Sequence, residues 1–159
     1  MDKLLQILNS DARLSNGVIA TMLGITEKEV ADQIAGYEAQ GLIRGYRPLL
    51  DYDKMGEPFV EAIIELKVTP KRDFGFEEIA KKVASFPDVE DVYLMSGGYD
   101  LFVRITGKNF KDIALFVAQR LAILEGVVST ATHFILSRYK DNGILMADEK
   151  GDERGNISL

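Results

Sequence analysis

Three residues, Gly24, Ile25 and Thr26, separate two short stretches of helical spacing, and this turn constrains the fold more than any other feature. Ser15 can cap the helix before the turn, and Gly24 can end it. Thr26-x-x-Glu29 is a capping box that begins the next helix. The helix before the turn is expected to bury Val18, Ile19, Met22 and Leu23. So short a turn forces the two helices to cross steeply, which is helix-turn-helix geometry.

The first 50 residues therefore predict three short helices and a connector. The first helix ends at the cluster Asn9-Ser10-Asp11, and the third spans Thr26–Gln40. The expected inward residues are Leu4, Leu5 and Leu8 in the first helix and Val30, Ile34 and Tyr37 in the third. Leu42–Leu49 follows as a short extended segment, in which Pro48 restricts any pairing to a sheet edge.

The hydrophobic periodicity changes after a linker at residues 51–58. Phe59–Val68 alternates between apolar and polar residues, as a half-buried strand does. The pattern then predicts a helix over 74–86, strands over 89–96 and 100–106, a helix from Asn109, and a last strand over 127–139. Gly97-Gly98 marks a hairpin between the two middle strands. The order is β-α-β-β-α-β, and right-handed crossovers place both helices on one face of a four-stranded antiparallel sheet.

The sheet face away from these helices is expected to be apolar. Its expected residues are Ile63, Tyr93, Met95, Phe102 and, on one register of the last strand, Thr130, Thr132 and Phe134. Large exposed apolar patches mark interfaces. We therefore expect the chain to dimerise sheet to sheet. Residues 141–159 are acidic and are expected to form a loose C-terminal tail.

The charge of the chain does not favour nucleic acid. The formal net charge is −6, and residues 1–50 hold five basic and six acidic residues. The predicted helix Thr26–Gln40 contains one base, Lys28. Its four acids are Glu27, Glu29, Asp32 and Glu38. A dedicated nucleic-acid module usually has a basic surface, so the helical pattern and the charge point in opposite directions.

Composition also limits the location and the chemistry. There is no cysteine, which excludes disulfides and thiolate metal sites. No apolar run approaches the roughly 18 residues that span a bilayer, and the N-terminus has neither a signal nor a transit pattern. We expect a cytoplasmic protein.

No motif for catalysis or metal binding is visible. His133 is the only histidine, and no cluster of metal-ligand residue types accompanies it. The sequence has no nucleophile elbow and no phosphate loop, and Gly97-Gly98 lacks the strand-to-helix context of a dinucleotide site. We expect no enzymatic activity, no metal and no cofactor.

The chain resembles the Lrp/AsnC family of transcriptional regulators in four stretches: DARLSNGVIATMLGIT, GLIRGYRPLLD, SGGYDLFVRITGKN and LEGVVSTATHFIL. The resemblance covers about residues 1–140. It implies an α+β chain with a helix-turn-helix (winged-type) DNA-binding domain at 1–50 and a linker at 51–58. A ferredoxin-like βαββαβ domain for dimerisation and effector binding follows at 59–140, and the acidic tail occupies 141–159.

The resemblance implies a DNA-binding transcriptional regulator that senses an amino acid or a related small metabolite, as a homodimer or a larger oligomer such as an octamer. The implied DNA-binding residues are Thr26, Lys28, Glu29, Gln33, Arg44 and Arg47. The implied effector-binding residues are Gly97, Gly98, Tyr99 and Asp100, with Ser129, Thr130 and Thr132 as weaker candidates. Glycines leave backbone N–H groups bare for a carboxylate, and the carboxylate of Asp100 could hold an ammonium group.

The chain departs from this family in the DNA-reading helix. Family members commonly have a run of arginines after the valine that matches Val30, whereas this chain has Ala31, Asp32 and Gln33. Phosphate contacts need Lys or Arg, although an oligomer multiplies weak contacts through high effective concentration. The alternative is a ligand-sensing or protein-interaction protein of the same architecture that has lost direct DNA binding.

Two further alternatives concern the glycine hairpin. Gly97-Gly98 can be an ordinary hairpin turn, since glycine pairs commonly serve that role. Some proteins that resemble this family in their two-domain plan are decarboxylases of modified tetrapyrroles. Those enzymes use a histidine-bearing, tyrosine-rich pocket around the hairpin, which SGGYDLFV does not match.

Overall fold

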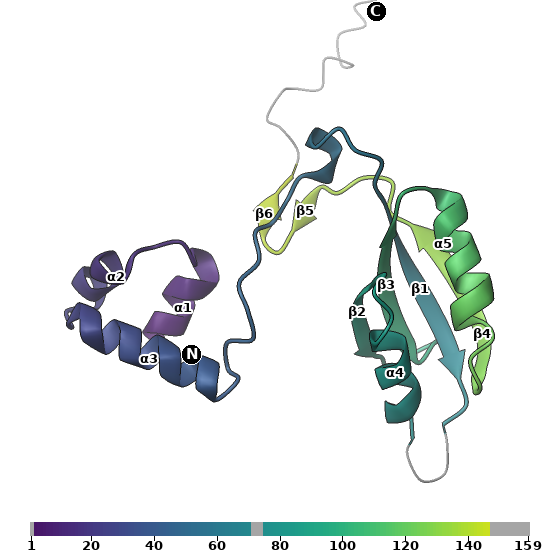
Figure 1. Cartoon of the computed structure of the whole chain (residues 1–159), viewed down its shortest axis with the longest axis horizontal. Coiled ribbons are helices and arrows are strands. Elements are labelled where there is room, and N and C mark those ends of the chain that lie inside the picture. The colour runs from purple at the N-terminus through teal and green to yellow at the C-terminus, as the bar shows by residue number, and fades with distance from the viewer. Residues whose placement is uncertain (1, 71–74, 147–159) are drawn as a thin grey trace, which may run out of the picture. The chain divides into compact units, whose positions relative to one another are not determined.

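A computed structural model describes residues 2–70 and 75–146 of the chain (Figure 1). The chain divides into two compact units, Met1–Pro48 and Leu49–Leu159. Each unit has its own buried apolar cluster, so each is described by itself.

The N-terminal unit contains three helices, α1 (Lys3–Ser10), α2 (Asn16–Leu23) and α3 (Glu27–Ala39). The predicted caps of α2 are confirmed. The N–H of Val18 donates to the hydroxyl of Ser15 over 3.3 Å, and Gly24 ends α2 in the left-handed conformation with φ of 69°. These local signals fix the turn between α2 and α3, and the core behind it consists of Leu4, Ile19, Ala20 and Val30.

The buried face of α2 differs from the predicted one. Ile19 and Ala20 are buried, whereas Val18 is 47% exposed and Met22 is 59% exposed. Ile19 and Ala20 pack in one cluster with Val30 of α3, and this contact turns Val18 and Met22 toward solvent. The predicted apolar stripe of α2 was therefore rotated by about one residue.

Helix α3 begins with the predicted capping box. The N–H of Glu29 donates to the Thr26 hydroxyl over 3.2 Å, and the N–H of Thr26 donates to Oε2 of Glu29 over 2.7 Å. Hydrogen bonds from the backbone and hydroxyl of Thr26 lower the pKa of Glu29 below its ordinary value. The connector after α3, which was expected to be a short extended segment, forms no strand. It contacts α3 through Tyr46, whose hydroxyl donates to Oε1 of Glu38 over 3.1 Å.

The C-terminal unit has the predicted β-α-β-β-α-β order. Its elements are β1 (Val60–Val68), α4 (Glu77–Ala84), β2 (Val89–Leu94), β3 (Leu101–Gly107), α5 (Phe110–Phe116), which continues as the π turn η2 (Val117–Leu121), and β4 (Val127–Phe134). The strands form one antiparallel sheet in the order β2-β3-β1-β4, and Figure 1 shows α4 and α5 on the same face of it. Helix α4 was predicted to begin at residue 74, which lies outside the described residues.

The register of β4 contradicts one prediction. Thr130 is paired with Leu66 and Thr132 with Ile64, and both partners are buried beneath the helices. Directly paired residues of an antiparallel ladder lie on the same face, so Thr130, Thr132 and Phe134 belong to the helix-covered face. The register of β4 on β1, which is continuous from Ala62↔Phe134 to Lys67↔Ser129, sets this alternation, and the sequence of β4 alone could not reveal it.

The open face of the sheet is consequently mixed and not uniformly apolar. It carries Ile63, Tyr93 and Phe102 as predicted, together with Glu61, Glu65, Asp91, Arg104, Ser129, Ala131 and His133. Glu61 is the one charged side chain that is buried in the described part of the chain, at 3% exposure. Ionisable side chains on this face are paired with one another: Arg104 with Glu61 and Asp91, and His133 with Glu65.

Residues 135–146 contain more regular structure than predicted. Strand β4 ends at Phe134, and the chain then forms a hairpin of β5 (Lys140–Asp141) and β6 (Ile144–Leu145). Its turn is Asn142-Gly143, both at positive φ, which is the Asn-Gly turn typical of two-residue hairpins. The loose tail predicted from residue 141 is wrong up to residue 146, and residues 147–159 of it lie outside the described residues.

The predicted linker at residues 51–58 is also partly structured. Tyr52–Lys54 forms the 3₁₀ turn η1, and the ring of Tyr52 stacks on that of Phe59 with 3.9 Å between centroids. Among the described residues, no helix combines the length and the apolar character needed to cross a membrane.

Removing the Thr26 hydroxyl tests the capping box. The substitution Thr26→Ala is expected to lower the free energy of unfolding of the N-terminal unit by about 1 kcal/mol, because the N–H of Glu29 loses its acceptor. Native-state amide hydrogen exchange at Val30 and Ile34 measures this loss. Thr21→Ala is the matched control, since its hydroxyl bonds the carbonyl of Gly17 within α2. An equal effect in both variants contradicts the assignment.

The lowered pKa of Glu29 predicts a dependence of stability on pH. The contribution of its carboxylate is fully present above 4.5, the ordinary glutamate value, and is lost as the pH falls through the lower folded-state pKa. Glu29→Gln keeps an amide oxygen as acceptor but cannot titrate. Exchange measured between about pH 6 and about pH 3 should show a smaller acid-dependent loss in this variant than in the wild type; identical losses exclude a role for Glu29.

Candidate functional site

The exposed ridge of α3 faces away from the N-terminal core. Val30 is buried, and Lys28, Asp32, Ala35 and Ala39 lie on the opposite side of the helix, where all four are exposed. This ridge has one positive and one negative side chain followed by two small residues. Such a surface permits close approach of the α3 backbone to a groove but offers a single phosphate-binding cation.

The predicted DNA-binding residues do not share one environment. Thr26 and Glu29 are bonded to each other at the start of α3, so they fix its first turn. Gln33 is exposed but lies on the flank of α3, beside the row of core residues. The guanidinium of Arg44 lies against Gly41, where an added Cβ would be 3.0 Å from Cζ.

The remaining two candidates, Lys28 and Arg47, are exposed. Lys28 belongs to the ridge of α3, and Arg47 belongs to the connector that follows α3. The structure therefore brings one of the six predicted residues, Lys28, onto the part of α3 that faces solvent most directly.

The β2–β3 hairpin holds the main effector-binding candidates. The N–H of Asp100 donates to the carbonyl of Leu66 over 2.9 Å, and its Oδ2 accepts the N–H of Val68 over 2.8 Å. The carbonyl of Asp100 also accepts the N–H of Met95 over 2.8 Å. Asp100 thus joins the hairpin loop to the end of β1, a role that the sequence did not reveal.

The loop itself is open on its outer side. Gly97 has φ of 147°, a conformation that favours glycine, and nothing lies within 4 Å of a Cβ built on Gly97 or Gly98. Tyr99 is partly buried beside them. Backbone N–H groups next to bare glycines are suited to binding a carboxylate.

The weaker candidates on β4 do not join this loop in a single chain. Thr130 and Thr132 lie on the helix-covered face, whereas Ser129 pairs with Lys67 and lies on the open face. Strand β1 separates β4 from β3 in the sheet. The seven predicted effector residues therefore do not line one common pocket within the chain.

A cavity of about 480 Å³ lies at the same end of β1, on the helix side. Its lining residues are Val68, Thr69, Gly75, Phe76, Glu78, Ile79, Lys81, Lys82, Ser85, Leu124 and Glu125. None of the predicted effector residues is among them, but Val68 joins the two places, because its N–H donates to Asp100. A cavity of this size accommodates a small metabolite.

Within residues 2–70 and 75–146, no group of three or more His, Cys, Asp or Glu side chains is placed to hold a metal ion. His133 lies on the open sheet face, with Nε2 3.5 Å from Oε1 of Glu65.

Comparison with known proteins gives consistent matches. The model of the Lrp/AsnC ligand-binding domain matches residues 61–145. The HTH-type transcriptional regulator YugG of Bacillus subtilis (strain 168) is 43% identical over 157 residues, which cover 98% of this chain and 95% of YugG. The HTH-type transcriptional regulator LrpA of Pyrococcus abyssi is 31% identical, covering 86% of this chain and 94% of LrpA.

The fold also matches solved structures. The transcriptional regulator NMB0573 of Neisseria meningitidis, solved as a complex with L-methionine, superposes with a TM-score of 0.71 at 22% identity. The match covers 89% of this chain and 93% of that protein. At this identity the likeness establishes the shared two-unit fold.

The hydrogen bonds of Asp100 can be tested by truncating its side chain. Asp100→Ala leaves the partly buried N–H of Val68 without its acceptor, which is expected to lower the free energy of unfolding of the C-terminal unit by about 1–3 kcal/mol. Urea unfolding measures the loss. The control is Asp88→Ala, an exposed aspartate in the turn before β2; an equal loss in the control contradicts the role of Asp100.

Proposed function

The chain belongs to the Lrp/AsnC family of transcriptional regulators, and from this premise we propose that it binds operator DNA through α3 and an amino-acid effector at the β2–β3 hairpin. Members of this family are regulators and not enzymes. The protein acts in the cytoplasm, where operator DNA is available to it.

One observation supports the DNA-binding half most strongly. Helix α3 follows α2 after a three-residue turn, is capped by Thr26, and presents an exposed ridge opposite its core. This is the arrangement in which a recognition helix enters the major groove. Lys28, Arg44 and Arg47 supply the phosphate contacts in this proposal, and Gln33 reads a base edge.

The effector half rests on the hairpin. Backbone N–H groups beside Gly97 and Gly98 bind the carboxylate of an amino acid, and the second carboxylate oxygen of Asp100, Oδ1, accepts a hydrogen bond from its ammonium group. An apolar side chain suits the neighbouring cavity, whose walls include Val68, Phe76 and Ile79. The L-methionine complex of the Neisseria regulator supports an amino acid of this kind.

The third part of the proposal is assembly. Several copies compensate for the few cations of one DNA-binding unit, because linked units bind at high effective concentration. Exposed apolar side chains on the C-terminal unit, such as Tyr93 at 54% and Val128 at 64% exposure, support contacts between copies. We therefore propose that two copies form a homodimer through the open sheet face, and that dimers assemble into larger oligomers.

Selection from a random-sequence duplex library with the full-length protein tests the proposal. Fluorescence anisotropy on the selected duplex should show binding that weakens with salt at a slope of about −2.7 for each DNA-binding unit, since three cations contact phosphate. L-Methionine should change the affinity. Failure to enrich any sequence at low salt, with the protein folded, contradicts the DNA-binding half.

The acidic ridge yields a sharper test. Asp32→Arg replaces the acid on the ridge of α3 with a phosphate-binding cation and should raise affinity for the selected duplex roughly tenfold at low salt. Asp88→Arg makes the same charge change in the C-terminal unit and serves as control. If selection with the wild type enriches no duplex and the same selection with Asp32→Arg does, the result favours the alternative in which the native chain senses ligand without reading DNA.

A further inference from the structure

An ion-pair network crosses the open face of the sheet. It consists of Asp91 on β2, Arg104 on β3, Glu61 on β1 and Arg138 beyond β4. Arg104 is bonded to Asp91 through Nε and Nη2, and its Nη1 lies 2.8 Å from Oε1 of Glu61. Oε2 of Glu61 is paired with Nη2 of Arg138. The network therefore extends from the edge strand β2 across β3 and β1 to the C-terminal segment.

Two side chains of this network, those of Glu61 and Arg138, are largely removed from solvent, so their charges need partners within the protein. The side chain of Glu61 is 3% exposed and that of Arg138 is 17% exposed. Two carboxylates face two guanidinium groups, so the network is neutral as a whole. A buried carboxylate is tolerated when each oxygen has a charged partner, and Arg138 is the partner of the second oxygen.

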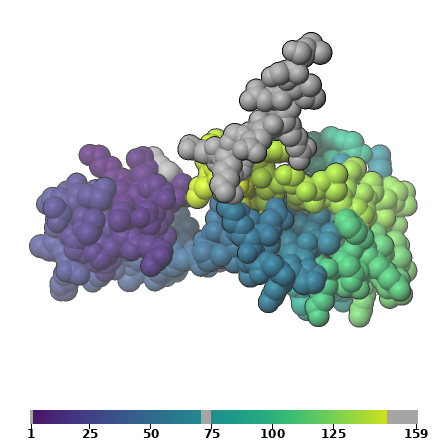
Figure 2. Space-filling view, turned by 90° about the horizontal axis from the view of Figure 1, so that it is seen from above, coloured from purple at the N-terminus to yellow at the C-terminus, as the bar shows by residue number. Residues whose placement is uncertain are grey.

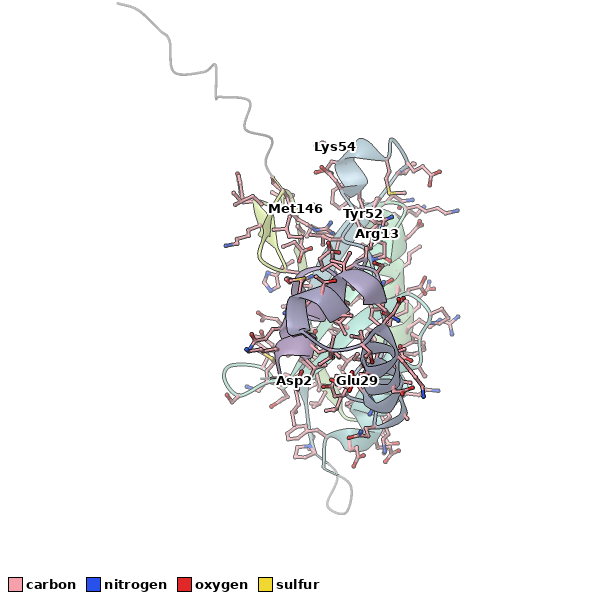
Figure 3. All side chains as sticks on the ribbon, turned by 90° about the vertical axis from the view of Figure 1, so that its left-hand side faces the viewer. Asp2, Arg13, Glu29, Tyr52, Lys54 and Met146 are labelled. Atoms are coloured by element: carbon pink, nitrogen blue, oxygen red, sulfur yellow. The ribbon has the colours of Figure 1, made fainter. Side chains whose placement is uncertain are left out.

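The other side of Arg138 contacts the segment that precedes β1, residues 52–59, which we call the tether segment. The guanidinium carbon lies 5.3 Å from the ring centre of Tyr52 and 5.7 Å from that of Phe59. Both distances allow cation–π attraction. Arg138 also lines a cavity of about 200 Å³ with Asp51, Tyr52, Asp53, Lys54 and Met146, of which Figure 3 labels Tyr52, Lys54 and Met146.

The segment that carries Arg138, residues 135–146, is tied to the sheet at its start and closed on itself at its end. The N–H of Ile135 donates to the carbonyl of Glu61 over 2.9 Å, and the N–H of Met146 donates to the carbonyl of Tyr139, within the segment, over 3.0 Å. Figure 2 shows this yellow C-terminal segment bordering the blue segment that leads into β1. Arg138 is consequently held between the sheet and the tether segment.

We propose that Arg138 is a positioning residue, which couples the β2–β3 hairpin to the tether segment that leads to the DNA-binding unit. The inference rests on the proposed function, because it concerns how an effector signal leaves the hairpin. Strand β2 runs directly into the hairpin loop, and Asp91 on β2 is the first member of the network. A shift of β2 therefore alters the pairing of Arg104, Glu61 and Arg138 in turn, and with it the contact on Tyr52.

Limited trypsin digestion tests the contact without any ligand. Lys54 lies in the tether segment, so cleavage after it requires this segment to leave Arg138. In the full-length protein, Arg138→Met should speed cleavage after Lys54 roughly tenfold, whereas Lys140→Met, an exposed cation of β5, should not. Cleavage after Arg44, which precedes the tether segment, is the internal reference. Equal cleavage after Lys54 in wild type and Arg138→Met overturns the proposal.

The coupling is measured as the ratio of DNA affinities with and without L-methionine, on the selected duplex. In Arg138→Met this ratio should fall to about one, while calorimetry shows L-methionine binding within about twofold of the wild type. Arg138→Lys keeps the charge and should restore part of the ratio, which a purely structural role does not predict. An unchanged ratio in Arg138→Met overturns the proposal.

Tyr52→Leu provides a second variant that leaves the pair of Glu61 and Arg138 intact. Tyr52→Leu should also speed cleavage after Lys54 and reduce the ratio of DNA affinities with and without L-methionine. This variant therefore tests the proposal even if Arg138→Met does not fold. If the wild type itself shows no response to L-methionine, the proposed function fails for this effector, and the trypsin result still decides whether Arg138 holds the tether segment.

Discussion

The ion pairs of the buried Glu61 carboxylate with Arg104 and Arg138 are the interactions on which the C-terminal unit most depends. This carboxylate is buried on a sheet face that otherwise meets solvent, and it needs two cations because a buried carboxylate with an unpaired oxygen is strongly destabilising. One cation, Arg104, comes from the neighbouring strand, and the other, Arg138, comes from beyond the sheet. The C-terminal segment therefore packs against the start of β1. The stacked rings of Tyr52 and Phe59 contact the guanidinium group of Arg138 in turn.

The N-terminal unit is built by different means. Its helices are short, and their caps at Asp2, Ser15 and Thr26 satisfy backbone N–H groups that would otherwise lack partners. The exposed ridge of α3 has one cation, Lys28, and one acid, Asp32, so a single copy of this helix has little electrostatic attraction to DNA. In the proposed function, control of DNA binding depends on how many DNA-binding units are presented together and how they are held, and we assign both tasks to the C-terminal unit.

Much of the fold could be predicted because its signals are local. The capping box of Thr26 and Glu29, the left-handed Gly24 and the glycine turn at Gly97-Gly98 are each set by neighbouring residues. The order of strands and helices followed from the change in periodicity. The Asn142-Gly143 hairpin depends on an equally local signal, but it lies at the start of an acidic stretch whose composition predicts a loose tail.

The remaining features depend on contacts between distant residues. The side of β4 that faces the helices is set by its register on β1, from Ala62↔Phe134 to Lys67↔Ser129. The burial of Glu61 depends on Arg138, which lies far along the chain, so the alternating pattern of β1 marked Glu61 as an ordinary solvent-facing residue. The structural role of Asp100 was missed for the same reason, because its acceptor oxygen serves Val68 on another strand.

The most direct test of this account is sedimentation velocity of the full-length protein, alone and with its selected duplex, at the concentration where binding is half complete. The account predicts a dimer or a larger oligomer in both samples, since reading units with so few cations bind DNA firmly only when several are joined. A single subunit that binds the duplex with full affinity would contradict it.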